Sequence, residues 1–548
     1  MKKYKLLVLM FFISVVTACA QTTPVQIGPR ANTYDDPANG IYVSPSGNDA
    51  TADGSIGKPY KRINSALNAA KPGSTIILRT GTYREGINVR VRQPNITIKS
   101  RKGEWAIIDL TTGYNPKDED SGVYFDPEAS GCKLQGLEVM GGYYAVALET
   151  KWNWGGDDDW VAASNIIIED CKLHDSRYDV VKVKPNCDNV TIRFNEIYNS
   201  GKGWKAGDCT PDGRGNAEGI DNVNGDNMKV QNNYIHDICT NGIYAKGGAT
   251  DALIENNRIE RVFGGGGILV GFETNLEYFD TKVNPKYYEN IRGVVRNNLI
   301  INTAVEGIGL YASMDAQVYN NTLVNVNNNA PFHSAIYFGI ATQDGEPYPG
   351  SPPNIRPKIH HNIVSQPSAY NRPMVEIRYS VLDDIYPLSA LDGKPTMNNN
   401  CYYIAGKSAT FNDFRPGSTL NNAGFAAWKT HISGESGSIE ANPSLNANYM
   451  PSNSQCAGMG IQYPLIVGSN VGIGTSVHAT ETTAYIRAGI LYIQNALAET
   501  LQVYSINGTL LFNFQKPEGK ASYSLNLSKG TELIIRGSSG WTKKLFVQ

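Results

Sequence analysis

A degenerate repeat runs through the middle of this 548-residue chain and constrains its fold more than any other feature. Most repeats consist of alternating apolar residues, an asparagine, one polar residue and an aliphatic residue. Aligned on the central position, the repeats carry Cys171, Asn195, Asn233, Asn257, Asn298, Asn321 and Asn362. Successive central positions lie 23–24 or 38–41 residues apart. A short period with occasional insertions is typical of a solenoid that carries added loops on one face.

The alternation of apolar and polar residues within each repeat predicts strands rather than helices. The L-x-x-L-x-L framework of leucine-rich repeats is missing. We therefore predict an all-β fold, a right-handed parallel β-helix in which each coil contributes about three short strands. Equivalent asparagines are expected to stack above one another and to hydrogen-bond along the stack, which is a structural role.

The ends of the solenoid differ from the repeats. Residues 41–43 and 61–85 predict a strand, a helix near Ile63–Ala70 and the first coil. The helix has an apolar stripe, which suits it to capping the open end of the solenoid. Residues 439–458 indicate an irregular closing segment at the other end.

The C-terminal part of the chain has a different pattern. From about residue 483 it shows longer alternating strands and an Asn507-Gly508 hairpin signal. We therefore expect a β-helix domain over residues 40–470 and a separate small β-sandwich over residues 483–548.

The first twenty residues predict a secretory signal peptide. Three lysines among the first five residues precede an apolar run over residues 6–16, which is too short for a stable membrane span. Two modes of processing remain open. Residues 16–19 (VTAC) resemble a lipoprotein signal that would lipidate Cys19, and residues 18–20 (ACA) resemble an ordinary cleavage site. No other apolar stretch is long enough to cross a bilayer, so no transmembrane span is expected.

Composition and charge narrow the class of protein further. The chain has 49 lysines and arginines against 51 aspartates and glutamates, so nucleic acid is not an expected partner. With 18% charged residues and 55 glycines, the chain resembles neither a helical bundle nor a disordered acidic segment. Its cysteines show no C-x-x-C pair and no zinc spacing, which favours isolated buried thiols with one or two bridges.

A second strand in each coil also aligns across the repeats and predicts which side chains point outward. The first outward row is Ala147, Lys182, Asp221, Tyr244, Leu269, Gly309 and Tyr337. The second outward row is Glu149, Lys184, Val223, Lys246, Gly271, Tyr311 and Gly339. These rows bring lysines and acids together on one outer stripe. The histidines at or near repeat positions (174, 236, 360 and 361) are interpreted as structural.

The β-helix region resembles secreted bacterial right-handed β-helix proteins, a set that includes polysaccharide lyases. The resemblance rests on residues 42–50 (YVSPSGNDA), 59–70 (PYKRINSALNAA) and 73–85 (GSTIILRTGTYRE). The tail from Leu491 to Gln548, with VYSING at its centre and KKLFVQ at its end, resembles C-terminal sorting domains of the type IX secretion system of Bacteroidetes. This resemblance implies a Gram-negative source, the type IX machinery as a partner, and a protein that is secreted or held at the outer membrane or cell surface.

A lyase that acts on a uronic-acid polymer removes the proton at C5 of the sugar and must neutralise the negative charge that develops. Ca²⁺ held by carboxylates, or a cluster of cationic side chains, supplies that neutralisation. A base must also lie within hydrogen-bond reach of C5. The predicted lysine and acid rows contain both kinds of group.

The segment Asp179-Val-Val-Lys-Val-Lys184 is similar to the acidic-x-x-x-x-Lys element of the chondroitinase B and alginate lyase family. The resemblance implies that Asp179 is a Ca²⁺ ligand and Lys184 the base. That family carries Arg-His-Gly about one coil later, where this chain has Gly203-Trp-Lys-Ala-Gly207. Lys205 is therefore the candidate replacement among the catalytic residues.

Lys246 is a rival base in the same predicted row as Lys184. Glu218 and Asp221 lie between the two lysines and are expected to coordinate Ca²⁺, with Glu149 one coil earlier. Ca²⁺-dependent β-helix pectate lyases use a similar stack of acids beside a lysine. The loop residues 157–159 (DDD) offer further carboxylates close by. Because sugar rings stack on aromatic faces, the predicted substrate contacts are Lys182, Tyr244, Trp152, Trp154, Trp204 and Tyr311.

Three functions remain open at this point. The first is a Ca²⁺-assisted lyase that cleaves an acidic polysaccharide and acts as a monomer. The second is a glycoside hydrolase, with two carboxylates about 6.5–9.5 Å apart if it inverts; its candidates are Glu218, Asp221, Asp179 and Glu306. The third is a non-catalytic adhesin or glycan-binding solenoid. A hydrolase needs no lysine base, so the lysine and acid rows favour the lyase.

Overall fold

The computed structural model contains two compact units, residues 1–471 and 472–548. In the first unit the described residues are 23–111, 122–151, 160–201, 217–341, 352–382 and 386–468. In the second unit they are 483–487, 490–496, 499–505, 509–516, 519–525, 531–537 and 542–546. No helix within these ranges is long and apolar enough to cross a membrane.

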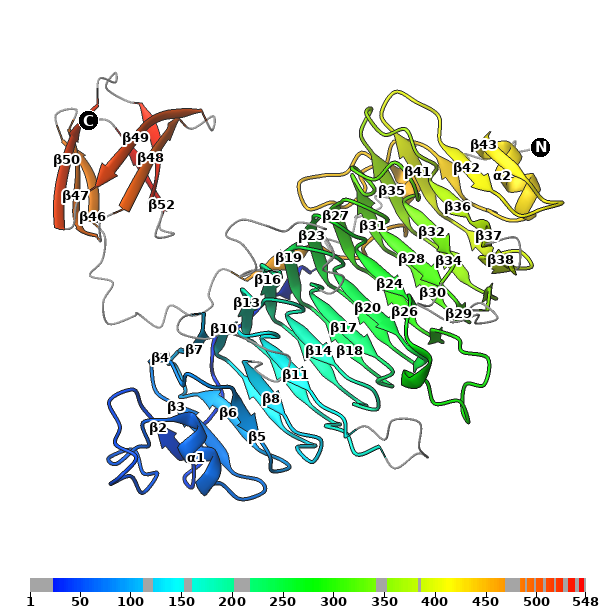
Figure 1. The fold of residues 1–548 in the computed structure, drawn as a ribbon. Helices are drawn as coiled ribbons and strands as arrows, with labels where there is room; N and C mark the ends of the chain where they lie inside the picture. Colours follow the sequence, from blue (N-terminus) through cyan, green and yellow to red (C-terminus); the bar gives the residue numbers. More distant parts are fainter. Residues whose placement is uncertain are drawn as a thin grey trace, which may run out of the picture. The chain divides into compact units, whose positions relative to one another are not determined.

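The first unit is a parallel β-helix in which successive coils add strands to three long sheets of twelve strands each (Figure 1). Sheet 1 consists of β5 (Val89–Val91), β8 (Val123–Phe125), β11 (Val146–Leu148), β14 (Val181–Val183), β17 (Ile220–Val223), β20 (Ile243–Lys246), β24 (Ile268–Val270), β28 (Ile308–Tyr311), β32 (Ile336–Gly339), β36 (Val375–Ile377), β42 (Thr410–Asp413) and β43 (Leu420–Gly424). Its strands are parallel except for the last pair, β42 and β43.

Sheets 2 and 3 complete the coils. Sheet 2 consists of β2 (Ile41–Val43), β3 (Thr75–Leu78), β6 (Thr97–Ser100), β9 (Lys133–Gln135), β12 (Ile167–Glu169), β15 (Thr191–Arg193), β18 (Lys229–Gln231), β22 (Leu253–Glu255), β26 (Val294–Arg296), β30 (Gln317–Tyr319), β34 (Lys358–His360) and β40 (Thr396–Asn398). Sheet 3 consists of β4 (Gly81–Tyr83), β7 (Ala106–Leu110), β10 (Glu138–Gly141), β13 (Lys172–His174), β16 (Glu196–Tyr198), β19 (Tyr234–Ile238), β23 (Arg258–Val262), β27 (Leu299–Thr303), β31 (Thr322–Val324), β35 (Ile363–Gln366), β41 (Cys401–Ile404) and β44 (Ile439–Glu440).

Shorter strands fill the corner after sheet 1 in the later coils. A small parallel sheet consists of β21 (Ala249–Thr250), β25 (Asn290–Ile291), β29 (Ser313–Met314), β33 (Asn354–Ile355) and β39 (Leu391–Asp392). An antiparallel hairpin is made by β37 (Tyr379–Leu382) and β38 (Tyr386–Ser389). The repeat pattern does not indicate this corner sheet, because its strands lie between the two aligned strands of each coil.

The core is a stack of aliphatic side chains inside the coils. In sheet 1, Ile220, Ile243, Ile268, Ile308 and Ile336 pair one above another and are fully buried. Their burial is what alternation predicts, since every second residue of a strand faces the same side. The predicted parallel β-helix is confirmed, together with the inward positions of its strands.

The asparagine ladder also forms and is fully buried. Backbone N–H and side-chain Nδ2 of Asn257 both donate to Oδ1 of Asn298, at 3.0 Å each. The same contact repeats from Asn195 through Asn362 to Asn400. The residue before each ladder position has a left-handed backbone, as at Asn256 (φ 57°). Asparagine tolerates that conformation better than most residues, which explains the recurring Asn-Asn pairs.

Both open ends of the solenoid are capped by a helix (Figure 1). At the first end, α1 (Ile63–Ala69) buries Ile63, Ala66 and Leu67, as predicted. At the other end, α2 (Phe425–Ile432) buries Trp428 and Ile432. This second helix was not anticipated from the sequence, which indicated only an irregular closing segment. Single 3₁₀ turns, η1 (Leu276–Tyr278) and η2 (Ser454–Cys456), lie in connecting loops.

Two extended segments run outside the solenoid along one corner. Residues 25–36 cross several coils. The backbone N–H of Gly28 donates to the carbonyl of Asn232, and Arg30 forms an ion pair with Asp170 at 2.7 Å. Further along, the Asn32 amide donates to backbone carbonyls of residues 100–104. Residues 458–468 cross the later coils, where the N–H of Gly460 donates to the His361 carbonyl. The two segments meet where β1 (Val25–Ile27) pairs with β45 (Leu465–Val467).

The second unit contains two antiparallel sheets that share one core. One sheet consists of β46 (Thr483–Arg487), β47 (Ile490–Ala496) and β50 (Gly519–Ser524). The other consists of β48 (Glu499–Ser505), β49 (Leu510–Lys516), β51 (Glu532–Gly537) and β52 (Thr542–Phe546). Leu491 of the first sheet packs with Val503 and Ile535 of the second, which gives the predicted β-sandwich.

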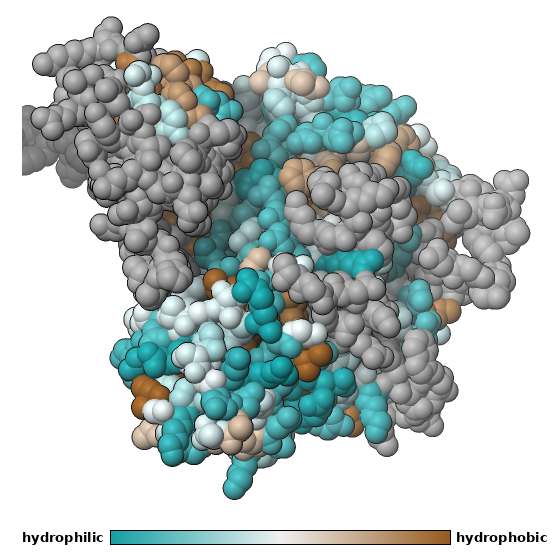
Figure 2. Space-filling view, turned by 60° about the vertical axis from the view of Figure 1, so that its left-hand side comes forward, coloured by the Kyte–Doolittle hydropathy of each residue, from teal (hydrophilic) through white to brown (hydrophobic). Residues whose placement is uncertain are grey.

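The described surface and the cysteines agree with the composition. Hydrophilic residues cover most of the coloured surface in the view of Figure 2, and hydrophobic residues form small patches.

Among the described cysteines, Cys239 is disulfide-bonded. The buried free thiols are Cys132, Cys171, Cys187, Cys401 and Cys456.

Candidate active site

The register of sheet 1 determines which side chains share its outer stripe. Lys182 pairs with Ala147 on one side and with Asp221 on the other. Asp221 in turn pairs with Tyr244, which pairs with Leu269. The ladder therefore follows the first predicted outward row. In the second row, Val223 pairs with Lys246 and Tyr311 with Gly339, again as the alignment predicts.

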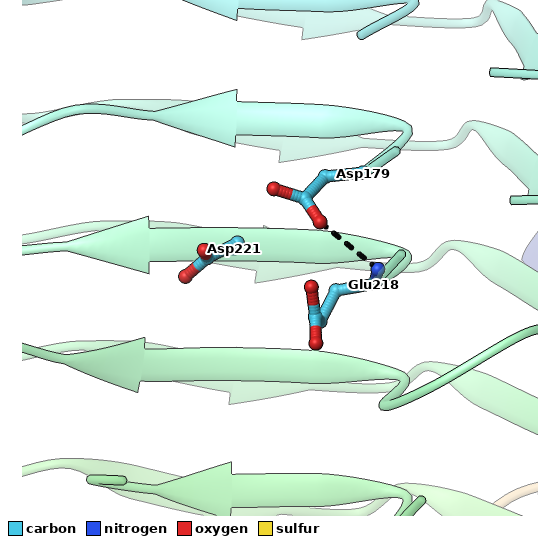
Figure 3. Close-up of side chains that lie close together, drawn as sticks. All are labelled: Asp179, Glu218 and Asp221. Carbon is cyan, nitrogen blue, oxygen red and sulfur yellow. Dashed lines mark hydrogen bonds between the residues drawn. The ribbon is translucent and has the colours of Figure 1, made fainter. Parts of the chain in front are cut away.

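Asp179, Glu218 and Asp221 form a buried acid cluster (Figure 3). One oxygen from each carboxylate lies within 4.8 Å of the others. Because Val181 pairs with Ile220, the residues two positions earlier, Asp179 and Glu218, begin neighbouring coils at the same edge of sheet 1. The Glu218 backbone N–H donates to Oδ1 of Asp179 at 3.0 Å.

Lys182 lies inside this acid cluster. Its ammonium forms an ion pair with Asp221 and lies 3.3 Å from Oδ2 of Asp179. Burial lowers the pKa of Lys182, but the charges of the two aspartates raise it well above its ordinary value. Burial raises the pKa of Asp221, but the charges of Lys182 and Lys246 bring it below its usual value. Lys182 was predicted to contact substrate. In the structure its ammonium is instead held in place by the two aspartates.

Glu218 differs from Asp221 in its protonation. Burial and the negative charge of Asp179 raise the pKa of Glu218 well above its usual value. Its Oε1 accepts hydrogen bonds from the Thr240 hydroxyl (2.8 Å) and the Asn241 amide (3.4 Å). The acid cluster therefore holds two carboxylates with opposite tendencies to carry a proton.

Each acid of the cluster keeps one buried oxygen that has no hydrogen-bond partner within the described ranges: Glu218 Oε2, Asp221 Oδ1 and Asp179 Oδ2, the last of which lies 3.3 Å from the Lys182 ammonium. Leaving such an acceptor unsatisfied costs about 1–3 kcal/mol, and more for a charged group. An oxygen-only set of this kind is what Ca²⁺ prefers as ligands. These three residues can hold a divalent cation.

Lys246 ends β20 beside the acid cluster. Its ammonium lies 4.6 Å from the centre of the Tyr244 ring, and no acid in the described part of the chain forms an ion pair with it. Its charge nevertheless favours the ionised forms of Glu218, Asp221 and Glu289 and opposes the rise in pKa that burial causes in each. With 9% of its surface exposed, Lys246 is the lysine of this stripe that remains available for chemistry.

Lys184 and Glu149 bind each other instead of joining the acid cluster. The Lys184 ammonium lies 2.8 Å from Oε2 of Glu149, one coil away. The pairing follows from the register, because Ala147 faces Lys182 and both residues lie two positions further along. The structure therefore places the predicted ligand Glu149 with Lys184, and outside the group of three acids.

Glu289 is a site residue that the sequence analysis missed. It is fully buried next to β25, where its Oε2 accepts hydrogen bonds from the Gly247 N–H (2.8 Å) and the Thr274 hydroxyl (2.7 Å). Burial raises its pKa to about 8, against the opposing effect of Lys246. The first of these hydrogen bonds fixes Gly247, the residue that follows Lys246. No repeat signal points to Glu289, because it lies in an insertion just before the corner sheet.

The predicted aromatic contacts are of two kinds. Tyr244 and Tyr311 are buried in an apolar cluster with Leu269 and Tyr337, so their rings form part of the packed outer stripe. Trp152, Trp154, Trp204 and Lys205 lie outside the described residues, as does the segment 157–159.

The histidines 174 and 236 have the structural surroundings expected of repeat positions. Each has both ring nitrogens bound by acids: His174 contacts Glu138 and Asp175, and His236 contacts Glu196 and Asp237. The ring of Tyr198 is stacked between them, 4.4 Å from His174 and 5.0 Å from His236.

Known proteins match parts of this chain. Residues 121–287 and 218–372 match the family described as right handed beta helix region, and residues 45–90 match a family described as a protein of unknown function (DUF1565). Pectate lyase PEL9 of Emericella nidulans is 31% identical over 119 residues, which is 19% of this chain and 29% of the relative. The chain therefore spans less than a third of that relative's length.

Solved structures with a similar arrangement include two lyases. One is pectate lyase Pel9A, with 15% identity, a TM-score of 0.44, and coverage of 80% of this chain and 92% of that chain. Another is the alginate lyase from Paenibacillus sp. str. FPU-7, with 17% identity, a TM-score of 0.37, and coverage of 56% of this chain and 90% of that chain.

Proposed function

We propose that this protein is a polysaccharide lyase that cleaves a uronate-containing glycan by β-elimination, with Lys246 as the base. One observation carries the proposal: the Lys246 ammonium, without an ion-pair partner in the described ranges, lies beside buried carboxylates with unpartnered oxygens. The local identity to a pectate lyase supports the same reaction class.

The proposed reaction moves one proton and breaks one carbon–oxygen bond. The C5–H bond breaks and its electron pair forms the C4–C5 double bond, while the C4–O bond breaks and the leaving oxygen takes up a proton from solvent. Lys246 accepts the C5 proton, which requires its neutral form.

Asp179, Glu218 and Asp221 are proposed to hold a divalent cation, for which Ca²⁺ is the best chemical match. When bound, the cation would stabilise the negative charge that develops on the sugar carboxylate during proton removal. The acids contribute what the cation needs: oxygens on two neighbouring coils, already fixed by the ladder and already shielded from water.

Lys246 is preferred over Lys184 as the base because of their partners. The ammonium of Lys184 is bound to Glu149 at 2.8 Å, so it is already engaged by another side chain. Lys184 is also one coil removed from the line that joins Asp221 and Tyr244.

A glycoside hydrolase is the second candidate, and one observation favours it. Glu218 and Asp221 are neighbouring carboxylates whose pKa values are shifted in opposite directions, as in acid and base pairs of hydrolases. Their oxygens lie within 4.8 Å, which is shorter than the separation of about 6.5–9.5 Å typical of inverting enzymes. This close approach favours a retaining arrangement for this pair, in which Lys246 would have no role.

We also propose that the protein acts outside the cell and that its C-terminal β-sandwich is an export signal for the type IX machinery. The support is the sequence of the tail, with VYSING within residues 501–510 and KKLFVQ at the end. Recovery of the full chain from culture medium or from the outer surface of cells would test this.

The reaction class can be tested with the full chain and a panel of uronic polysaccharides, namely pectate, alginate and chondroitin sulfate. A lyase releases reducing ends and ultraviolet-absorbing unsaturated uronate in equal amounts, and Lys246→Ala removes both. Reducing ends without the absorbance would identify the hydrolase. Binding without either product would leave a non-catalytic glycan-binding protein.

A further inference from the structure

A second buried acid lies further along the edge of sheet 1 that carries Glu218. The ladder Ile220–Ile243–Ile268–Ile308 is continuous, so Glu306, two residues before Ile308, occupies the position that Glu218 has before Ile220. Three coils separate the two acids, which corresponds to about 14 Å along the solenoid. Glu306 is buried and is not part of the acid cluster.

Glu306 fixes the orientation of a histidine. Its Oε1 accepts a hydrogen bond from the Tyr311 hydroxyl at 2.6 Å, and its Oε2 lies 2.7 Å from Nδ1 of His333. Burial raises the pKa of Glu306, but the hydrogen bond and charge of His333 bring it below its usual value. An ionised carboxylate only accepts hydrogen bonds, so Nδ1 of His333 carries a proton and donates it.

The second ring nitrogen of His333, Nε2, does not contact Glu306. Within the described ranges Nε2 has no hydrogen-bond partner, and 23% of the side chain is exposed. This differs from His174 and His236, in which acids occupy both nitrogens. His333 also has a left-handed backbone (φ 67°), a conformation that is often retained at functional sites. Its ring is held against Tyr337, with centroids 3.9 Å apart.

The surroundings of His333 suit an acidic sugar. Phe332 is 54% exposed, and its ring centroid lies 4.8 Å from that of His333. The guanidinium of Arg372 donates to the His333 carbonyl at 3.1 and 3.2 Å and also lies 3.7 Å from the buried carboxylate of Glu376, so its charge is partly compensated. A cation beside an exposed aromatic ring provides a partner for a carboxylate and a surface for the sugar ring.

The edge between the acid cluster and His333 is formed by glycine. Residues 264–267 are all glycine, and a Cβ at Gly265 would lie 2.2 Å from Oδ1 of Asn241. The run keeps this coil free of side chains at the edge. Phe263, which is 49% exposed, directly precedes the run and offers a second aromatic surface.

We propose that His333, oriented by Glu306, forms a distal subsite for the carboxylate of a uronate unit in the glycan that is cleaved over the acid cluster. The ring binds that carboxylate as an imidazolium, whose Nδ1–H donates to Glu306 and whose Nε2–H donates to the sugar carboxylate. The inference rests on the proposed function and extends it along the substrate. A linear glycan laid parallel to the solenoid axis crosses one coil after another, and the coil spacing of about 4.8 Å is comparable with one sugar unit. Such a chain passes the glycine edge and reaches His333 only if it is several units long.

The test uses full-length protein carrying Lys246→Ala, so that substrate is bound without being cleaved. Calorimetry measures its affinity for a uronate disaccharide and a uronate hexasaccharide. Adding His333→Asn keeps a donor for Glu306 and suits the left-handed backbone, but removes Nε2. We expect about a tenfold weaker binding of the hexasaccharide, or about 1.4 kcal/mol, and unchanged binding of the disaccharide.

Two further variants and one modified ligand complete the design. Phe332→Ala changes an exposed side chain, so it tests the same subsite without risk to folding, and it should also weaken only the hexasaccharide. His360→Asn, on sheet 2, is the matched control and should change neither affinity. A hexasaccharide whose carboxylates are reduced to alcohols should bind with the same affinity whether or not the protein carries His333→Asn.

Equal losses for both oligosaccharides, no loss in either His333→Asn or Phe332→Ala, or an equal loss with the reduced hexasaccharide would overturn the subsite. These results leave the lyase proposal standing if wild-type protein releases unsaturated uronate. Absence of that product from every uronic polysaccharide would instead overturn the proposed function, and the subsite with it.

Discussion

Lys182 on β14 and Asp221 on β17 are direct neighbours in the ladder of sheet 1, and their side chains form an ion pair across the two coils. Asp179, at the start of the same coil as Lys182, shares that ammonium at 3.3 Å. A lysine held by two buried carboxylates keeps its proton. The base of the proposed elimination must therefore be another lysine, and Lys246 is the one beside the cluster.

Replacing Lys246 with alanine should lower kcat by about 10²–10⁴-fold, the usual contribution of a general base. KM should change little, because the acid cluster remains in place. The initial rate of unsaturated uronate release measures both constants. Lys184→Ala is the matched control and should cost far less, since it only breaks the pair with Glu149. A larger loss of kcat in Lys184→Ala than in Lys246→Ala would show that the base is misassigned.

Ca²⁺ should stabilise the folded protein. A cation that binds only the native state at 100 times its Kd adds about 2.7 kcal/mol, so Tm should rise on adding Ca²⁺ and fall in chelator. Glu218→Gln should lose most of this response, because it removes a carboxyl ligand that can ionise on binding the cation, while keeping an acceptor for Thr240. Glu149→Gln should keep the response, since Glu149 pairs with Lys184 outside the cluster. A Ca²⁺ response lost in Glu149→Gln but kept in Glu218→Gln would contradict the assignment.

Glu289 should make stability depend on pH. Its pKa is about 8 in the folded protein and 4.5 in the unfolded chain. Between these values the folded state keeps a proton that the unfolded state has lost, so its contribution is full below pH 4.5 and is lost as the pH rises toward 8. Within that window the effect approaches about 1.4 kcal/mol per pH unit.

Glu289→Gln removes this ionisation and retains an acceptor for Gly247 and Thr274. The free energy of unfolding in urea should therefore rise for the variant relative to the wild type between pH 5 and pH 8. Parallel pH profiles of the two proteins would show that Glu289 does not titrate in this range.

Interrupting the asparagine ladder should lower the free energy of unfolding substantially. Asn298→Ala removes the acceptor of both the backbone N–H and the side-chain amide of Asn257, inside the fully buried stack. We expect a loss of about 3 kcal/mol in the free energy of unfolding. Asn328→Ala, at an exposed position, should change it by less than about 0.5 kcal/mol. Similar losses for both variants would argue against a structural ladder.

The sequence carries the register of this fold because periodic burial leaves a periodic pattern. Alternation identified Ile220 and Ile243 as inward residues, and by the same rule placed Lys182 and Asp221 in one outer row. The alternation could not show that the Lys182 side chain would form ion pairs with Asp179 and Asp221, or that Lys184 would pair with Glu149. Those choices depend on side-chain directions and competing charges, which alternation does not encode.

Residues outside the repeat were harder to predict. Glu289 lies in an insertion, and its position next to Gly247 is set by a corner sheet whose two-residue strands leave little pattern. His333 belongs to a loop whose left-handed backbone is stabilised by contacts with Glu306 and Tyr337. Helix α2 is short, and its buried face is defined by the coil that it covers.

The meeting of β1 with β45 joins parts of the chain that are far apart in sequence. A stack in which each turn touches only its neighbours can unravel one turn at a time from either end. Here Val25 lies against Leu465 and the two outer segments each cross several turns, so fraying toward an end must also break the contacts that these segments make with the turns they cross. Because such a distant contact closes a very long loop, it is expected to form late in folding and to lock the finished stack.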